Sequence, residues 1–314
     1  MGKSKLDGTN VIQDYLSGLS ADFLGERYGL SNVAVRNYLR KHGVQLRDSH
    51  DSVYDSSRQS PYHFNEHWLD ELDCAEKFYF LGFFAADGCN SKKYNNAKIK
   101  LQTCDLELLE KFKGLLESDR PIYNVHQKET KNRKESFAVN FELTSKYFCE
   151  KLEELGLSER KTYTLQLPDY ISDQYFRDYV RGVFDGDGNI SVSYKGRARG
   201  MSSIAGNPRF LLQLKEKIMK ILDINIIFYQ KNENCGYIKI NRQEDLKIFL
   251  DWMYKDSNLY MERKYQRYLE FLSTRDFSVE TKGQKQRRLK QQENEIINKY
   301  ISGIEETNMI CERY

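Results

Sequence analysis

The stretch FLGFFAADG at residues 80–88 recurs as VRGVFDGDG at residues 180–188. In both copies an apolar run ends in Asp-Gly, which places Asp87 and Asp187 at equivalent positions. A single Asp-Gly after an apolar run is typical of a helix that stops at a glycine cap. Two copies, each followed by a strand pattern, instead predict two copies of one module that meet around a shared site.

Small residues recur one helical turn apart in both copies, a spacing that lets two helices approach closely. They are Gly82 and Ala86 in the first copy and Gly182 and Gly186 in the second. We expect these four residues to form the interface between the modules and to bring Asp87 close to Asp187. A helix C-terminus already carries partial negative charge, so two carboxylates there repel each other unless a cation is present. Mg²⁺ (or Mn²⁺) suits such a site, because Mg²⁺ binds one or two carboxylates together with phosphate oxygens and water.

From about residue 71 the pattern is helix, two strands, helix, two strands, helix, and the same order then repeats. Helices are predicted at 105–117, 145–155, 207–222 and 243–254, and hairpin strands at 122–128 with 136–142 and at 226–231 with 236–241. Each module closes with the phrase Glu-Arg-Lys, at 159–161 and at 262–264. The prediction is an α+β protein with two pseudo-symmetric αββαββα modules, residues 71–170 and 171–275.

Alternating residues after each motif predict half-buried strands with one polar face. Lys98, Lys100 and Gln102 share a face after the first motif. In ISVSYKGRAR at 190–199, read as one alternating strand, the shared face holds Ser191, Ser193, Lys195, Arg197 and Arg199. The five basic residues on these faces (Lys98, Lys100, Lys195, Arg197 and Arg199) are candidates for contact with nucleic acid.

The N-terminal region, residues 1–47, reads as a small all-α unit with three short helices between residues 10 and 43. Ser20 and Ser31 are suitable N-caps, and the tight joint at 28–31 resembles a helix-turn-helix. If the third helix enters a major groove, it presents Asn32, Arg36, Asn37 and Arg40. The alternative is a three-helix unit that only packs.

Two further segments complete the expected organisation. Residues 48–70 are rich in Ser and Asp and are predicted to be a linker. Residues 276–314 contain a basic run, TKGQKQRRLK, and then EIINKYISGI, which echoes NVIQDYLSGL at 10–19. We expect a basic linker followed by an incomplete second helix-turn-helix.

Bulk properties exclude several classes of protein. No apolar run approaches the ~20 residues that a membrane span requires, so no membrane partner is expected. The six cysteines lack a CxxC pair, which argues against zinc or a disulfide framework and favours reduced thiols in a soluble, intracellular protein. The formal net charge of +3 is too small by itself to indicate nucleic acid.

The paired motifs resemble the LAGLIDADG homing endonucleases of the single-chain type, over roughly residues 71–275. The resemblance implies that the last acid of each motif, Asp87 and Asp187, binds a divalent metal, and that the two sheets form a saddle over double-stranded DNA. It also implies roles near the attacking water for Gln102, at the end of a strand, and for Lys239, in YIKIN.

The two copies depart from each other at two places. The sixth motif position is Ala85 in the first copy and Asp185 in the second, and this side chain is expected to pair locally without affecting cleavage. The first-module counterpart of Lys239 is predicted to be Asn140.

The function expected from the sequence is a monomeric, metal-dependent, site-specific double-strand DNA endonuclease without an obligate protein partner. Its ends lack the terminal nucleophile and His-Asn of an intein, which favours a free-standing or intron-encoded product. Two alternatives stay open. One is an RNA maturase that assists intron splicing on the same scaffold, and the other is a non-catalytic DNA-binding transcription regulator.

Overall fold

The computed structural model describes residues 6–17, 19–46, 62–129, 135–195, 198–274 and 277. Arg197 and nearly all of the predicted 276–314 segment lie outside the described residues. No described helix has the length and apolar character needed to cross a bilayer.

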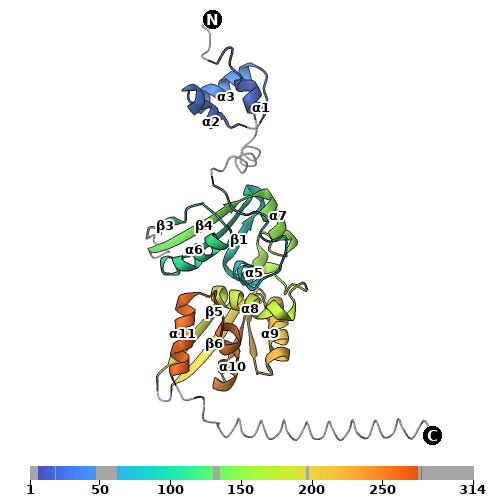
Figure 1. Cartoon of the computed structure of the whole chain (residues 1–314), viewed down its shortest axis with the longest axis vertical. Coiled ribbons are helices and arrows are strands. Elements are labelled where there is room, and N and C mark those ends of the chain that lie inside the picture. Colours follow the sequence, from blue (N-terminus) through green and yellow to red (C-terminus); the bar gives the residue numbers. More distant parts are fainter. Residues whose placement is uncertain are drawn as a thin grey trace, which may run out of the picture.

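Two modules with the same order of elements make up residues 75–254 (Figure 1). The first contains α5 (Ala75–Asp87), β1 (Gly88–Ser91), β2 (Asn96–Gln102), α6 (Leu106–Leu115), β3 (Tyr123–Gln127), β4 (Ser136–Thr144) and α7 (Lys146–Glu154). The second contains α8 (Asp173–Asp187), β5 (Gly188–Ser193), β6 (Arg199–Gly206), α9 (Pro208–Leu222), β7 (Ile227–Asn232), β8 (Cys235–Ile240) and α10 (Gln243–Tyr254). The strand orders, β1-β2-β4-β3 and β5-β6-β8-β7, are also the same. The predicted α+β fold with two αββαββα modules is therefore confirmed.

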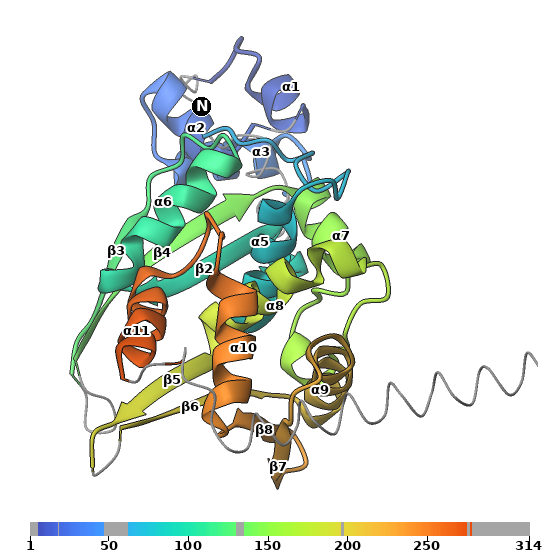
Figure 2. The ribbon, with the colours of Figure 1, turned by 60° about the horizontal axis from the view of Figure 1, so that its bottom comes forward.

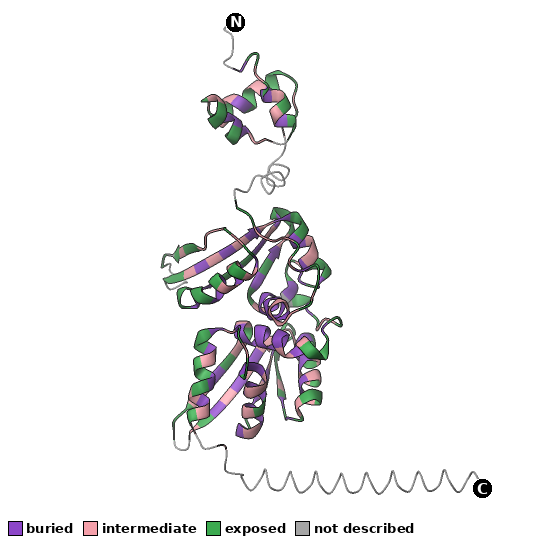
Figure 3. Ribbon diagram, viewed as in Figure 1, coloured by how far each residue is buried: buried purple, intermediate pink, exposed green. Residues whose placement is uncertain are grey.

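Strand alternation places the core on one face of each sheet. In β2, Ile99 and Leu101 are buried, whereas Lys98, Lys100 and Gln102, which alternate with them, are exposed. Buried residues concentrate on the helix-covered faces and on the two central helices (Figure 3). The opposite face of each sheet is left polar.

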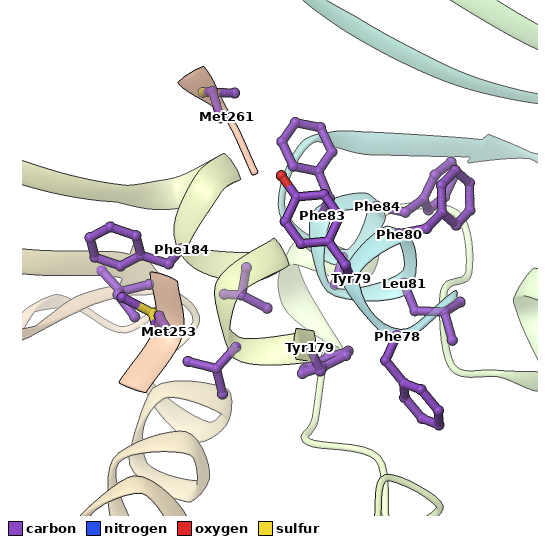
Figure 4. Close-up of a cluster of buried hydrophobic side chains, with 14 of the residues drawn as sticks. Phe78, Tyr79, Phe80, Leu81, Phe83, Phe84, Tyr179, Phe184, Met253 and Met261 are labelled. Carbon is purple, nitrogen blue, oxygen red and sulfur yellow. The ribbon is translucent and has the colours of Figure 1, made fainter. Parts of the chain in front are cut away.

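Helices α5 and α8 pack directly against each other between the two sheets (Figures 1 and 2). A Cβ atom on Gly82 would lie 2.0 Å from the carbonyl oxygen of Tyr179, and one on Gly182 would lie 2.1 Å from that of Tyr79. Since real Cβ atoms do not come so close to backbone, only glycine permits this separation of the helices. A large aromatic cluster surrounds the contact (Figure 4).

An ion pair and a hydrogen bond add to this interface between the modules. Nε of Arg263 lies 2.9 and 3.1 Å from the two carboxylate oxygens of buried Asp105, at the start of α6. The hydroxyl of Tyr79 on α5 donates to Asp185 on α8 at 2.7 Å. Polar groups from both modules therefore help to fix their relative position.

The segment 190–199 differs from the prediction of one alternating strand. The chain reverses between Ser193, at the end of β5, and Arg199, at the start of β6, and these two residues are direct cross-strand partners. Lys195 lies in the connection. Directly opposed residues share a face of a sheet, so alternation alone cannot distinguish a tight hairpin from one continuous strand.

The end of the predicted linker is packed rather than extended. Leu69 is fully buried in the main core, and the Trp68 ring contacts the Phe80 ring edge-on at 5.4 Å. The backbone N–H of Asn65 donates to the carbonyl oxygen of Leu116 at 2.8 Å. The aromatic residues of 62–69 thus anchor this segment to the first module.

A further helix, α11 (Glu262–Ser273), follows the second module and was not predicted. Its Phe271 side chain is buried and lies over Gly200, where a Cβ atom would come within 2.3 Å of the ring. The second Glu-Arg-Lys phrase forms the first three residues of this helix, which brings Lys264 towards the centre of the molecule.

The N-terminal unit has its own small core and three helices, α1 (Val11–Leu16), α2 (Ala21–Tyr28) and α3 (Asn32–Lys41). The hydroxyl of Ser20 accepts from the N–H of Phe23, and that of Ser31 accepts from the N–H of Ala34. Gly29 ends α2 with φ of 65°, a left-handed conformation that favours glycine. The helices lie where the sequence predicts them.

Candidate active site

The two motif acids end the two central helices. Asp87 is the last residue of α5 and Asp187 the last residue of α8, and a Cβ atom on Gly186 would lie 3.4 Å from a carboxylate oxygen of Asp87. Both side chains reach solvent, yet the surrounding protein removes enough water to raise the pKa of each. For Asp187, burial and then the charge of Asp87 raise the pKa to about 6. The close helix contact therefore brings two mutually repelling carboxylates together.

Two buried lysines flank these carboxylates in a pseudo-symmetric way. Lys161, in the 3-10 turn Lys161–Tyr163, donates from Nζ to the carbonyl oxygen of Gly88. Lys264 donates from Nζ to the carbonyl oxygens of Phe184 and Gly186, at 2.7 and 3.0 Å, and also to that of Asp185. Each ammonium group thus binds the negative end of a central helix.

Burial lowers the pKa of both lysines, that of Lys264 to about 8, and the charges of Asp87 and Asp187 oppose this shift. In return, both ammonium groups lower the pKa of both acids. Each lysine also lies 5.7 Å from the ring of the motif phenylalanine of its own module, Phe84 or Phe184. The site therefore combines two acids and two cations at the helix ends.

The donor set fits a hard divalent cation. No group of three or more His, Cys, Asp or Glu side chains within the described part of the chain could hold a metal ion by itself. Two carboxylates at adjoining helix ends remain, which is the partial ligand set that Mg²⁺ uses when water and substrate oxygens complete its coordination. Asp87 and Asp187 are the residues that would hold such an ion.

The sheet register identifies which strand residues correspond between the modules. Gly88 pairs with Ile99 in the first module, and Gly188 pairs with Ile204 in the second. Gln102 therefore corresponds to Asn207, three residues beyond Ile204. Gln102 is exposed at the end of β2, and Asn207 lines a small pocket that also contains Asp187. Gln102 is the last residue of β2, whereas Asn207 follows β6 as the N-cap of α9, and its side-chain oxygen accepts from the N–H of Arg209 at 2.9 Å.

The same register corrects the expected counterpart of Lys239. Lys239 on β8 pairs with Ser203 on β6, and the equivalent rung in the first module pairs Glu142 on β4 with Lys98 on β2. The counterpart of Lys239 is therefore Glu142, not Asn140. Counting along the sequence gave the wrong residue because the connections between equivalent elements have different lengths in the two modules. Lys239 lies 5.0 Å from the ring of Tyr229, on the polar face of the second sheet.

Of the candidate DNA contacts, Lys98, Lys100, Lys195 and Arg199 are exposed. In the N-terminal unit, Arg36, Asn37 and Arg40 are exposed on one helix, and the Nη1 atom of Arg40 donates to the side chain of Asn37 at 3.3 Å. The Asn32 amide instead donates to Asp22 on the preceding helix, so it braces the joint between α2 and α3.

Lys161 and Lys264 are site residues that the sequence did not assign. The signal was the repeated Glu-Arg-Lys phrase, whose lysines lie 74 residues after Asp87 and 77 residues after Asp187. The role of these lysines depends on their contact with the ends of α5 and α8, which are distant in sequence, so a local sequence pattern cannot predict it.

We expect the raised pKa of Asp187 to make folding stability depend on pH. A carboxyl group whose pKa is higher in the folded than in the unfolded state favours folding when protonated. Without divalent cations, Asp187→Asn should therefore be more thermally stable than the original protein at pH 7.5. This difference should shrink as the pH falls through about 6 and vanish near the unfolded pKa of about 4. Thermal denaturation of both proteins across this range measures it, and a constant difference would contradict the assigned burial.

Comparisons with known proteins identify the fold. Residues 76–156 match the family described as LAGLIDADG-like domain. No curated protein matches the chain. Among solved structures, full-length DUF199/WhiA from "Thermatoga maritima" is 15% identical, with 74% of this chain and 72% of that one covered and a TM-score of 0.43.

Two further matches are structures of DNA-bound proteins. The I-LtrWI LAGLIDADG homing endonuclease bound to target DNA is 13% identical, with 69% and 94% of the chains covered and a TM-score of 0.42. The LAGLIDADG meganuclease I-AabMI bound to uncleaved DNA is 13% identical, with 62% and 88% covered and a TM-score of 0.41. The chain thus contains a LAGLIDADG-like domain at residues 76–156, and its second module repeats the order of elements of the first.

Proposed function

We propose that this protein is a site-specific, divalent-metal-dependent endonuclease that cuts both strands of duplex DNA. The observation that carries the proposal is the convergence of Asp87 and Asp187 at the adjoining ends of α5 and α8, with a buried lysine beside each helix end. A protein that only bound DNA would have no use for two carboxylates that raise each other's free energy next to a phosphate backbone.

In this proposal the two acids hold one or more Mg²⁺ (or Mn²⁺) ions. Such an ion, when bound, stabilises the negative charge on the attacking and leaving oxygens of a phosphodiester. Gln102 orients the attacking water in one half-site, because its side-chain amide can both donate and accept a hydrogen bond. Its counterpart Asn207 instead caps α9, where its side-chain oxygen accepts from the N–H of Arg209. The acids themselves set the position of the scissile phosphates between the modules.

The two lysines have different parts in the proposed mechanism. All three N–H groups of the Lys264 ammonium can be satisfied by the three carbonyl oxygens that they reach, so this group acts as a fixed positive charge beside the phosphate. Lys161 has a single acceptor among the described residues, the carbonyl oxygen of Gly88. Its remaining N–H groups are free to donate to a non-bridging phosphate oxygen.

The polar faces of the two sheets supply the proposed DNA contacts. Lys98, Lys100 and Arg199 are exposed on these faces and neutralise phosphates, and Lys195 does so from the β5–β6 connection. Tyr123 and Tyr229, at equivalent places on the outer strands, are 40% and 46% exposed and offer apolar contact to bases or sugars.

The proposal is tested by selection followed by cleavage. The full-length protein is incubated with a random duplex library in Ca²⁺ or EDTA, and bound duplexes are recovered and sequenced. The enriched sequence is then placed in a plasmid and treated with the protein and Mg²⁺. We expect linear plasmid cut at one position, and no product in EDTA.

Two outcomes would overturn the proposal in favour of another function. Enrichment of a duplex that Mg²⁺ never renders cleavable would indicate a DNA-binding regulator. Failure to enrich any duplex, together with tight binding to structured intron RNA, would indicate a splicing maturase.

The N-terminal unit is proposed to extend the DNA contact through α3. Deleting residues 1–47 should weaken affinity for the selected duplex and leave the cleavage position unchanged. The slope of log K against log salt concentration should become shallower by about 0.9 for each lost phosphate contact. Gel-shift or fluorescence-anisotropy titrations at several salt concentrations measure both effects. A Gln13→Ala variant, which changes an exposed side chain of α1 and no charge, is the control. Unchanged affinity and an unchanged salt slope would show that the N-terminal unit does not contact DNA.

A further inference from the structure

Asp185 is fully buried and accepts three hydrogen bonds from three different elements. The Tyr79 hydroxyl on α5 donates at 2.7 Å, the Tyr254 hydroxyl at the end of α10 donates at 2.6 Å, and the backbone N–H of Met261 donates at 2.8 Å. Figure 4 labels Tyr79 and Met261 among the buried side chains around the two central helices. Burying a carboxyl group is costly unless such donors satisfy it, so the three contacts fix each of these elements relative to α8.

The Met261 contact lies next to the active-site lysine. Met261 is the N-cap of α11, and Lys264 is in the first turn of that helix. Because a helical turn is stiff, fixing the N–H of Met261 also fixes the backbone of Lys264. The Lys264 ammonium then reaches the carbonyl oxygens of Phe184 and Gly186, on either side of Asp185.

The first module lacks this arrangement. Ala85 occupies the position equivalent to Asp185, and Lys161 lies in a short 3-10 turn. Arg160, directly before it, has a left-handed φ of 58°. The chain therefore places its two lysines by different means, and only the second depends on a buried carboxyl group.

We infer that Asp185 is a positioning residue that holds Lys264 at the end of α8, and that it acts on one half-site only. This inference rests on the proposed endonuclease function for its effect on cleavage. The placement of Lys264 itself is independent of that function. Sequence reasoning expected Asp185 to pair locally without affecting cleavage. The contacts instead extend from the interface of the modules to the active site.

The test uses two matched pairs of variants of the full-length protein. Asp185→Asn removes the carboxylate, and Asp245→Asn is its control, since Asp245 is equally buried but accepts from the N–H of Asn225, away from the site. Tyr254→Phe removes one donor to Asp185 and is mild enough to preserve folding. Tyr268→Phe is its control, because that hydroxyl donates to Asp251 on the neighbouring helix.

Two readouts separate positioning from simple destabilisation. The first is single-turnover cleavage of each end-labelled strand of the selected duplex. We expect Asp185→Asn to slow cutting of one strand by about tenfold or more, as loss of a supporting contact does at metal sites, with DNA affinity unchanged. Tyr254→Phe should slow the same strand to a smaller extent. Both controls should cut the two strands as the original protein does.

The second readout is acetylation of lysines by acetic anhydride, quantified by mass spectrometry. Lys264 should be protected in the original protein and in both controls, and should become reactive in Asp185→Asn, while Lys161 stays unchanged. Equal slowing of both strands, or a protected Lys264 in Asp185→Asn, would overturn the inference. If the original protein cuts no duplex, the proposed function fails, and acetylation alone decides the placement of Lys264.

Discussion

Replacing either motif acid with asparagine should abolish double-strand cleavage of the selected duplex. The amide keeps the shape of the side chain but removes the negative charge that a divalent cation requires. Metal-ion stabilisation of the reacting oxygens is worth several kcal/mol, so cleavage should fall by about a thousandfold or more. Plasmid linearisation assays with Asp87→Asn and Asp187→Asn measure this loss, because supercoiled, nicked and linear forms are resolved separately.

Binding of the duplex separates this effect from misfolding. Both variants should retain affinity for the selected duplex in Ca²⁺-free buffer, since less negative charge near the DNA backbone does not weaken binding. Asp173→Asn provides a control on the same helix, because Asp173 is highly exposed at the opposite end of α8. If both motif variants linearise the plasmid as fast as the Asp173→Asn control, the assignment of the active site is wrong.

Replacing Gly82 with alanine should strongly destabilise the protein. The new methyl group would lie 2.0 Å from the backbone oxygen of Tyr179, which cannot rotate away as a side chain can. The helices must therefore separate, and overpacking of this kind costs on the order of 3 kcal/mol. Chemical denaturation measures the loss of unfolding free energy. Cleavage should also fall, because the same separation moves Asp87 away from Asp187.

Gly114→Ala supplies the matched control for this prediction. Gly114 lies in α6, and a Cβ atom there would meet nothing within 4 Å. Alanine should therefore be neutral or stabilise the helix by about 0.5–1 kcal/mol. Equal effects of the two substitutions would show that α5 and α8 do not need glycine at their contact.

Most of the fold could be predicted from the repeated motif and from the alternation of apolar and polar residues in the strands. Apolar periodicity placed helices such as α9 and α10, and alternation in β2 separated Ile99 and Leu101 from the polar face. These are local properties, because a side chain's neighbours three or two positions away decide which face it shares. The close approach at Gly82 and Gly182 was also predictable, since small residues at helical spacing have few other uses in a buried helix.

The rest of the site depends on contacts between distant segments. Lys161 and Lys264 reach the helix ends across more than 70 residues of sequence. The counterpart of Lys239 depends on sheet register, which loop lengths obscure. Asp185 looks like an ordinary motif position until its three donors are known. In each case the sequence identifies the residue but does not show which distant residue it contacts.

Lys98 pairs with Glu142 in the first sheet, and the equivalent pair in the second sheet is Ser203 with Lys239. This difference has a consequence for the direction in which a duplex would bind. Two identical halves would let a duplex lie across them in either direction with equal free energy. Here the base of the rung lies on β2 in the first half and on β8 in the second, and the first half alone carries an acid on it, Glu142, which lies 3.6 Å from Arg120. Turning the duplex end for end on the proposed DNA-binding faces would therefore bring each half of the target against a different set of charges. The proposed endonuclease should therefore bind an asymmetric target in one preferred orientation.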